Sequence, residues 1–288
     1  MHSYLKSIGF SKIQAQDEIE NLIAKSIAES EICSEFRKDD GHLAVEFTKF
    51  TSANTGIKVI GEEDTKGNFH FSHYFPFCNS STVTHEESVY VDKRLENEAY
   101  SGACEDSRLG ISLIFYIQNC IDYLEKYKSE RYLEEAEICF SGLALDGKII
   151  LPNMQTVEKP LALSEAKTKK TLLEEAKKGN PEAIQNLTMK DIDLYASVMQ
   201  RIRKEDVLSV VRSSIIPTGS EADLYRVMGT ITDMKHEFNT ETGEGIWIFE
   251  LDANGIMINV SINENDLTGR PQIGMRFRGS LWMQGSLS

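Results

Sequence analysis

Four side chains that can bind a metal ion lie within one short stretch of the sequence: His70, His73, Cys78 and His85. Imidazole and thiolate are the ligands that zinc and late transition metals prefer. The surrounding residues alternate as in a β-strand, and on a strand His70 and His73 point to opposite faces. They could bind one ion only if the strand broke between them. We therefore predict no metal site here, and no pattern elsewhere predicts a cofactor.

The same stretch is the best place in the sequence for an enzyme site. His70, His73 and Tyr74, together with nearby acidic residues, could supply acid–base chemistry if a pocket gathered them. The chain has no G-x-S-x-G nucleophile motif, and His85-Glu86-Glu87 lacks the second histidine of a metalloprotease helix. An enzyme of unknown reaction, with its site in the N-terminal part, is therefore the alternative hypothesis.

Residues 142–148 match the spacing of a phosphate-binding loop up to its last position. Ile149 stands where a Ser or Thr would hold magnesium. Asp146-Gly147 is typical of a tight turn between two strands, and no helix follows to direct its N-terminus at a phosphate. The sequence predicts a β-hairpin over residues 137–151 and no nucleotide site.

The last strand-like segment combines two arginines with a tryptophan. Arg276, Arg278 and Trp282 alternate with the apolar residues Met275, Phe277, Leu281 and Met283. Burying the apolar set predicts an exposed Arg/Trp stripe, which is typical of protein interfaces and of grooves that bind single-stranded nucleic acid. Residues 223–288 contain nine acidic and five basic residues, which favours a protein partner or self-association. Alternatively, Trp282 packs at an interface between domains.

The whole chain is acidic, with a net charge of −14. This charge repels nucleic-acid phosphates and anionic membrane surfaces, so both partners are disfavoured. The five cysteines are widely spaced, and no pair has C-x-x-C spacing, which indicates reduced thiols. The sequence begins without a signal-peptide pattern and contains no apolar stretch long enough to cross a membrane. We expect a cytoplasmic protein.

Apolar spacing defines the elements of the first half. A helix is expected over residues 11–29, with Ser11 and Gln14 as its capping residues. Short connections between alternating runs predict an antiparallel meander. Its strands are expected at residues 43–47, 56–61, 67–75, 87–93 and 98–104. Apolar residues recur every three or four positions over 113–127, which favours a helix, although its β-branched start leaves a strand open.

The second half changes from helical to β patterns. Residues 160–206 are rich in Ala, Lys, Glu and Leu and predict helices. From Leu224 onward, four strand-like runs and a short helix near Asn265 resemble an OB-like barrel, with an SH3-like barrel or a plain antiparallel sheet as alternatives. The predicted fold class is α+β. It comprises an N-terminal antiparallel sheet with helices (1–156), a helical bridge (157–216) and a small OB-like β-barrel (217–288).

Three long irregular segments carry a resemblance to a known family. They are GNPEAIQNLTMKDID (179–193), KEDVLSVVRSSIIPTGSEADLYRVMGTI (204–231) and NDLTGRPQIGMRFRGSLWMQG (265–285). The chain resembles, over its full length, an uncharacterised family of Firmicutes, a domain of unknown function about as long as this chain. The resemblance implies no activity, substrate, cofactor or catalytic residue.

The leading hypothesis from these observations is a non-catalytic intracellular binding or regulatory protein that makes protein–protein contacts. It rests on the missing catalytic motifs and on the predicted stripe of Arg276, Arg278 and Trp282. The enzyme hypothesis is the first alternative. Binding of single-stranded nucleic acid by the C-terminal barrel is the second.

Overall fold

The computed structural model describes residues 2–83, 85–94, 99–106, 111–151, 213–219 and 222–288. The chain divides into two compact units, one formed by residues 1–105, 112–151 and 213–288 and the other by residues 106–111 and 152–212. All helices and strands given below belong to the first unit, apart from the end residues Asp106 and Ile111 of two strands. The helices predicted at 160–206, and with them most of the bridge at 157–216, lie outside the described residues.

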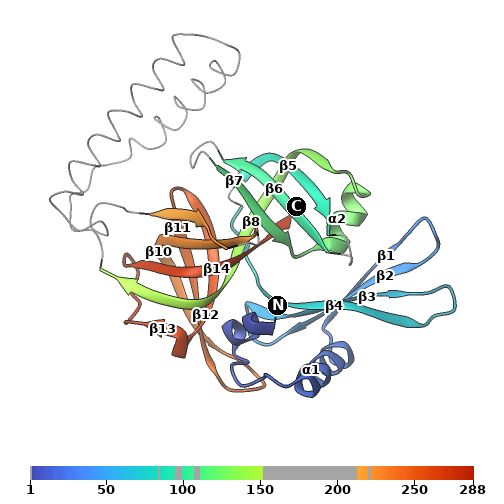
Figure 1. Cartoon of the computed structure of the whole chain (residues 1–288), viewed down its shortest axis with the longest axis horizontal. Helices are drawn as coiled ribbons and strands as arrows, with labels where there is room; N and C mark the ends of the chain where they lie inside the picture. Colours follow the sequence, from blue (N-terminus) through green and yellow to red (C-terminus); the bar gives the residue numbers. More distant parts are fainter. Residues whose placement is uncertain (1, 84, 95–98, 107–110, 152–212, 220–221) are drawn as a thin grey trace, which may run out of the picture. The chain divides into compact units, whose positions relative to one another are not determined.

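A four-stranded antiparallel sheet, in the order β1-β2-β3-β4, forms from the first half of the chain (Figure 1). Its strands are β1 (Ile32–Arg37), β2 (Leu43–Phe50), β3 (Thr55–Glu63) and β4 (Phe69–Cys78). Helix α1 (Gln16–Ala28) packs against β2 and β3, and its Ile19 and Leu22 are buried. The three meander strands predicted between residues 43 and 75 are confirmed.

Helix α1 begins five residues later than predicted because its cap differs from the one that the sequence suggests. Glu18 accepts hydrogen bonds from the backbone N–H groups of Gln14 and Ala15, both at 3.1 Å, which satisfies donors at the helix start. Ser11 instead donates its hydroxyl to Glu244 Oε1 at 2.8 Å. The predicted pair of Ser11 and Gln14 therefore does not start the helix.

The second sheet has ten strands. They are β5 (His85–Lys93), β6 (Tyr100–Asp106), β7 (Ile111–Ile117), β8 (Tyr132–Ile150), β9 (Ser214–Pro217), β10 (Leu224–Phe238), β11 (Gly245–Ala253), β12 (Ile256–Asn263), β13 (Leu267–Thr268) and β14 (Arg276–Leu287). Its hydrogen-bonded pairs close into two rings that share β8 and β14. One ring runs β10-β11-β12-β8-β14, and the other runs β5-β6-β7-β14-β8. Strand β9 adds to β10, and β13 adds to β8.

The predicted α+β class is wrong, because the described chain is mainly β and forms two sheets. The predicted OB-like barrel of residues 217–288 is also wrong as a separate module. Strand β12 pairs in parallel with β8, and β14 pairs with β8 along its whole length, so the C-terminal strands complete their hydrogen bonding only with residues of the first half. One sheet thus runs through both halves of the sequence.

The hairpin predicted around Asp146 and Gly147 does not form, because both residues lie inside the 19-residue strand β8. A Cβ atom at Gly147 would come within 2.5 Å of Phe277 and 2.6 Å of Ile262. Glycine is therefore required there for close packing and not for a turn. Asp146 accepts a hydrogen bond from the backbone N–H of Ser280 at 3.2 Å, where β14 shifts register.

The helix predicted over residues 113–127 is half strand. Residues 111–117 form β7, in which Leu113 and Phe115 are fully buried, and α2 (Cys120–Tyr127) follows. The β-branched and aromatic start decides the first half, since such residues pack well in a sheet. Within the described part of the chain, no helix is long and apolar enough to cross a membrane.

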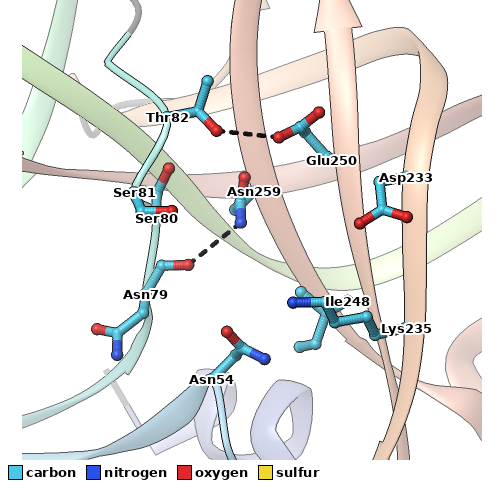
Figure 2. A pocket seen from close by; sticks show the side chains of 10 residues that line it. All are labelled: Asn54, Asn79, Ser80, Ser81, Thr82, Asp233, Lys235, Ile248, Glu250 and Asn259. Carbon is cyan, nitrogen blue, oxygen red and sulfur yellow. Dashed lines mark hydrogen bonds between the residues drawn. The ribbon is translucent and has the colours of Figure 1, made fainter.

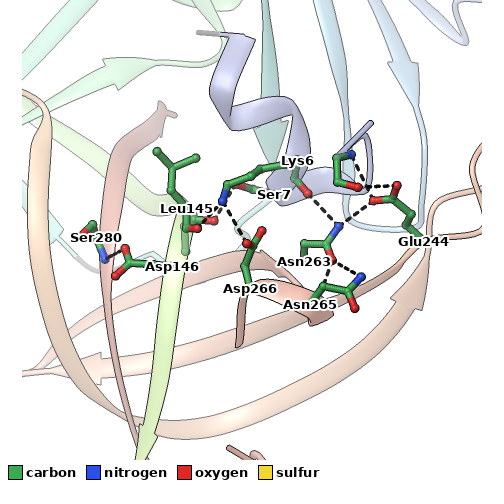
Figure 3. Close-up of polar contacts among 11 residues, drawn as sticks. Lys6, Ser7, Leu145, Asp146, Glu244, Asn263, Asn265, Asp266 and Ser280 are labelled. Atoms are coloured by element: carbon green, nitrogen blue, oxygen red, sulfur yellow. Dashed lines mark hydrogen bonds and ion pairs between the residues drawn. The ribbon is translucent and has the colours of Figure 1, made fainter. Parts of the chain in front are cut away.

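The N-terminal segment forms hydrogen bonds with residues at one end of the second sheet. Figure 3 shows Lys6, in the 3-10 helix η1 (His2–Ile8), donating to Leu145 O at 2.6 Å and to Asp266 of η2 (Glu264–Asp266) at 3.1 Å. Asn263 donates to Lys6 O at 3.2 Å and to Glu244 Oε2 at 2.7 Å. These bonds join β8, β12 and the turn before β11 through one short helix.

Candidate ligand-binding cleft

A polar cleft of about 460 Å³ lies between the segment that leaves β4 and one face of β10, β11 and β12. Figure 2 shows residues 79–82 on one side of the cleft and the strand residues on the other. The described residues that line it are Asn54, Asn79, Ser80, Ser81, Thr82, Asp233, Lys235, Ile248, Glu250 and Asn259. All of them except Ile248 are polar.

Strand register brings three of these residues into one row. Asp233 of β10 pairs directly with Glu250 of β11, and Glu250 pairs directly with Asn259 of β12. Directly paired residues on antiparallel strands point to the same face, with Cβ atoms about 5 Å apart. A register shift in β10 between Ile231 and Asp233 sets this alignment. The row therefore presents two carboxylates and one amide to the cleft.

Two threonines fix the carboxylate of Glu250. Thr82 donates its hydroxyl to Glu250 Oε2 at 2.9 Å, and Thr232 donates to Glu250 Oε1 at 2.8 Å. Each carboxylate oxygen can accept a further hydrogen bond. Glu250 is therefore held in one orientation and still has acceptor capacity.

Two buried oxygen atoms in the cleft have no hydrogen-bond partner among the described residues, namely Ser80 Oγ and Asn259 Oδ1. Asn259 donates its Nδ2 to Asn79 O at 3.4 Å, which directs its Oδ1 away from that carbonyl. Leaving a buried polar group unpaired costs about 1–3 kcal/mol. These two atoms of the cleft lining therefore keep unused hydrogen-bonding capacity.

The rim of the cleft is held by Glu237, which accepts hydrogen bonds from the backbone and side chain of Asn54. Asp233 and Lys235 precede Glu237 on β10, and both are exposed. Within the described chain, no ion pair joins the side chain of either residue to another group. The cleft thus combines fixed acceptors inside with one acid and one base at its rim.

A second cavity, of about 620 Å³, lies beside the β1–β2 turn. Its described lining consists of Phe36, Arg37, Lys38, Asp39, Asp40, Lys93, Tyr100, Leu124, Lys128 and Ser129. Lys38 is already paired with Glu62 at 2.7 Å, and this hydrogen bond is the main cause that lowers the pKa of Glu62. Charges of both signs lie in this cavity, so it favours no single ligand.

The structure does not bring His70, His73 and Tyr74 together as one site. His70 is exposed beside Asp64, whereas His73 is 5% exposed and its Nε2 lies 2.9 Å from Tyr116 Oη. Burial raises the pKa of Tyr74 to about 12, which disfavours its ionised form further. The enzyme hypothesis built on these three residues stays untested.

His73 and Cys78, two of the four residues with metal-binding side chains, are buried. Burial raises the pKa of the Cys78 thiol far above its ordinary value, which disfavours the thiolate that binds metals. In the part of the chain that the structure describes, no group of three or more His, Cys, Asp or Glu residues could hold a metal ion.

Arg276 and Trp282 are buried, so they do not form an exposed stripe with Arg278. Trp282 is 4% exposed, donates its Nε1 to Asp223 Oδ2 at 3.0 Å and contacts the rings of Tyr4 and Tyr116. Arg276 is 5% exposed and donates to Leu151 O at 3.0 Å. Only Arg278 is partly exposed. A role of these residues in partner binding stays a prediction.

Sequence reasoning missed the row of Asp233, Glu250 and Asn259. The alternation GIWIFEL shows that Glu250 shares a face with Ile248, but which residue lies opposite it depends on strand pairing. Ser80 belongs to a segment between strands and gives no periodic signal. The cleft could therefore not be assembled from the sequence.

The chain belongs to the family described as "Domain of unknown function, E. rectale Gene description (DUF3881)", whose model matches residues 5–285. This confirms the full-length resemblance to an uncharacterised family. No curated protein and no solved structure matches the chain.

Proposed function

We propose that this DUF3881 protein is a non-catalytic binding protein that holds a small polar molecule in the cleft of Figure 2. The observation that carries the proposal is the pair of buried oxygen atoms without a partner, Ser80 Oγ and Asn259 Oδ1. A ligand that donates hydrogen bonds to both would remove the cost of leaving them unpaired.

The size and lining of the cleft support a small polar ligand. A volume of about 460 Å³ falls in the ordinary range of small-molecule sites. Such sites are usually lined mainly by apolar side chains, whereas here only Ile248 is apolar. Binding must therefore come from directed hydrogen bonds and charge.

The lining also supports binding over catalysis. Its described residues include carboxylates, a lysine and hydroxyl groups that can serve in catalysis, but no histidine, cysteine or tyrosine accompanies them, and both oxygens of the Glu250 carboxylate already accept from threonines. Asp233 and Glu250 would repel a phosphate backbone, which argues against nucleic acid in this place. The protein partner predicted from the sequence depended on an exposed stripe of Arg276, Arg278 and Trp282. Because Arg276 and Trp282 are buried, the structure adds no support for that partner.

The test is a panel of sugars, polyols, amines and amino acids screened by ligand-detected nuclear magnetic resonance. We expect at least one compound to bind the wild-type protein and to bind Asn259→Leu about ten-fold more weakly, because the amide supplies both the acceptor and the contact to Asn79. Asn265→Leu is the matched control, since Asn265 is exposed, lies outside the cleft and, among the described residues, donates its side-chain hydrogen bond to Asn263.

Two results would contradict the proposal. One is a panel in which no compound binds. The other is a compound that binds wild type and Asn259→Leu with equal affinity while thermal melts show both proteins folded.

A further inference from the structure

The strand side of the cleft, from Asp233 at the rim to Asn259 inside, is rich in hydrogen-bond acceptors. Asp233, Glu250 and Asn259 lie in one row across three strands, and Ser80 Oγ faces them from the other side of the cleft. The Asn259 amide donates to Asn79 O, so its Oδ1 is the atom left for a ligand. The hydroxyls of Thr82 and Thr232 are both donated to Glu250. In the row of Asp233, Glu250 and Asn259 the groups left for a ligand are therefore acceptors, whereas the donors of the cleft, such as Lys235, lie outside the row.

Two like charges lie directly opposite each other in this row. Asp233 pairs with Glu250 across β10 and β11, and like charges at directly paired positions destabilise a sheet. No cation of the described chain forms an ion pair with either carboxylate. A positively charged ligand would remove this repulsion, and a neutral polyol would leave it.

We propose that the ligand is a small primary amine, whose ammonium group binds between Asp233, Glu250 and Asn259 Oδ1. An ammonium group has three N–H donors and no acceptor, which matches a wall of acceptors. Hydrogen bonds between charged partners are about twice as strong as neutral ones. This inference rests on the proposed function and names the chemical class that the same cleft recognises.

Replacing Lys235 tests whether amine binding becomes stronger or weaker. It lies two residues beyond Asp233 on the same face of β10 and lines the same cleft. Its ammonium repels a bound cation, so replacing it with a neutral side chain should strengthen amine binding. If the acceptors instead bind the ammonium group of Lys235 in the free protein, the same replacement should lower the stability of the protein.

A divalent metal ion is the competing ligand for an oxygen-rich wall. Calcium takes six to eight oxygen ligands and magnesium six, usually with several carboxylates or waters. The row supplies two carboxylates, and Lys235 lies nearby. Two carboxylates are few ligands for either ion, and Lys235 repels a divalent ion about twice as strongly as a singly charged ammonium. A magnesium titration separates the two cases.

The experiment titrates the full-length protein with ethylammonium chloride, tetramethylammonium chloride and glycerol at constant ionic strength, followed by backbone nuclear magnetic resonance. Ethylammonium should give saturable shifts at the cleft residues. Tetramethylammonium carries the same charge without N–H donors and should not saturate, and glycerol should bind more weakly. Asp233→Asn should weaken ethylammonium binding about ten-fold with no loss of thermal stability.

Lys235→Met should strengthen ethylammonium binding, and Asp92→Asn, an exposed carboxylate on β5, should leave it unchanged. Glycerol or a sugar that binds while ethylammonium does not would overturn the amine inference and leave the proposed function standing. Equal binding of tetramethylammonium, or saturable magnesium binding in place of ethylammonium, would also overturn it. If no probe binds and Lys235→Met lowers the melting temperature, both proposals fail.

Discussion

Buried polar atoms in the core have hydrogen-bond partners, whereas two buried polar atoms in the cleft have none among the described residues. In the core, Trp282 Nε1 and the Arg94 guanidinium both donate to Asp223, which is 1% exposed. In the cleft, Ser80 Oγ and Asn259 Oδ1 have no such donor among the described residues. A buried charge with several donors stabilises one arrangement of the core, whereas an unpaired buried acceptor costs free energy until a ligand arrives. This contrast separates structural polar groups from binding groups.

Trp282→Phe should lower the free energy of unfolding by about 1–3 kcal/mol, because Asp223 loses a buried donor. Phenylalanine also leaves a gap beside the rings of Tyr4 and Tyr116. Arg278→Ala, at a partly exposed position of the same strand, should change stability by no more than about 0.5 kcal/mol. Urea denaturation of both variants measures this. An equally small effect for Trp282→Phe would mean that the tryptophan is not structural.

The positions of individual strands are easier to predict from the sequence than the strands with which they pair. Alternation predicts strands at residues 43–47 and 56–61, and β2 and β3 lie there. At Asp146-Gly147 the turn pattern predicts a hairpin that does not form. Glycine is needed there to make room for Phe277, and the sequence alone does not distinguish such a glycine from one in a turn. Over residues 113–127, a spacing of three and four also fitted a strand followed by a helix. Local pattern does not distinguish these cases, because packing decides them.

An ion-paired cluster links α1, β2 and the turn between β10 and β11. Glu241 of the turn pairs with Lys25 of α1 at 3.0 Å and with Lys49 of β2. Burial alone would raise the pKa of Glu241, but hydrogen bonds from Lys49 and Lys25 outweigh it and hold the pKa below its ordinary value of 4.5. A carboxyl with a lowered pKa stabilises the fold above its unfolded pKa, and this contribution is lost as pH falls through the folded pKa.

Acid should therefore loosen this link. We expect the free energy of unfolding to fall as the pH drops from about 5 to about 3, and Glu241→Gln should flatten that fall, because its side chain cannot be protonated. Lys25→Met should flatten it in part, since Lys49 remains paired with Glu241. Urea denaturation at a series of pH values measures both slopes. A slope for Glu241→Gln that equals the wild-type slope would show that this carboxyl does not contribute.

Strand β8 decides how the two halves of the sequence combine. It pairs with β5 through residues 132–138, with β12 through residues 140–144 and with β14 through residues 138–150. Non-local pairings of this kind leave no trace in the periodicity of either half, because each strand alternates in the same way whichever neighbour it has. The predicted boundaries at 156 and 216 follow changes of composition and of periodicity, and neither carries information about pairing.

A fragment of residues 213–288 should therefore fail to fold by itself. Without β8, strands β12 and β14 each lose a hydrogen-bonded neighbour, and the buried side chains of Phe277 and Ile262 lose the backbone of Gly147 against which they pack. We expect poorly dispersed amide resonances for the fragment and a cooperative melt only for the full chain. Adding a peptide of residues 130–151 should restore dispersion, whereas a peptide with Gly147→Val should not, because its side chain would clash with Phe277. A fragment that folds alone would show that residues 217–288 form an independent domain and that the pairing with β8 is secondary.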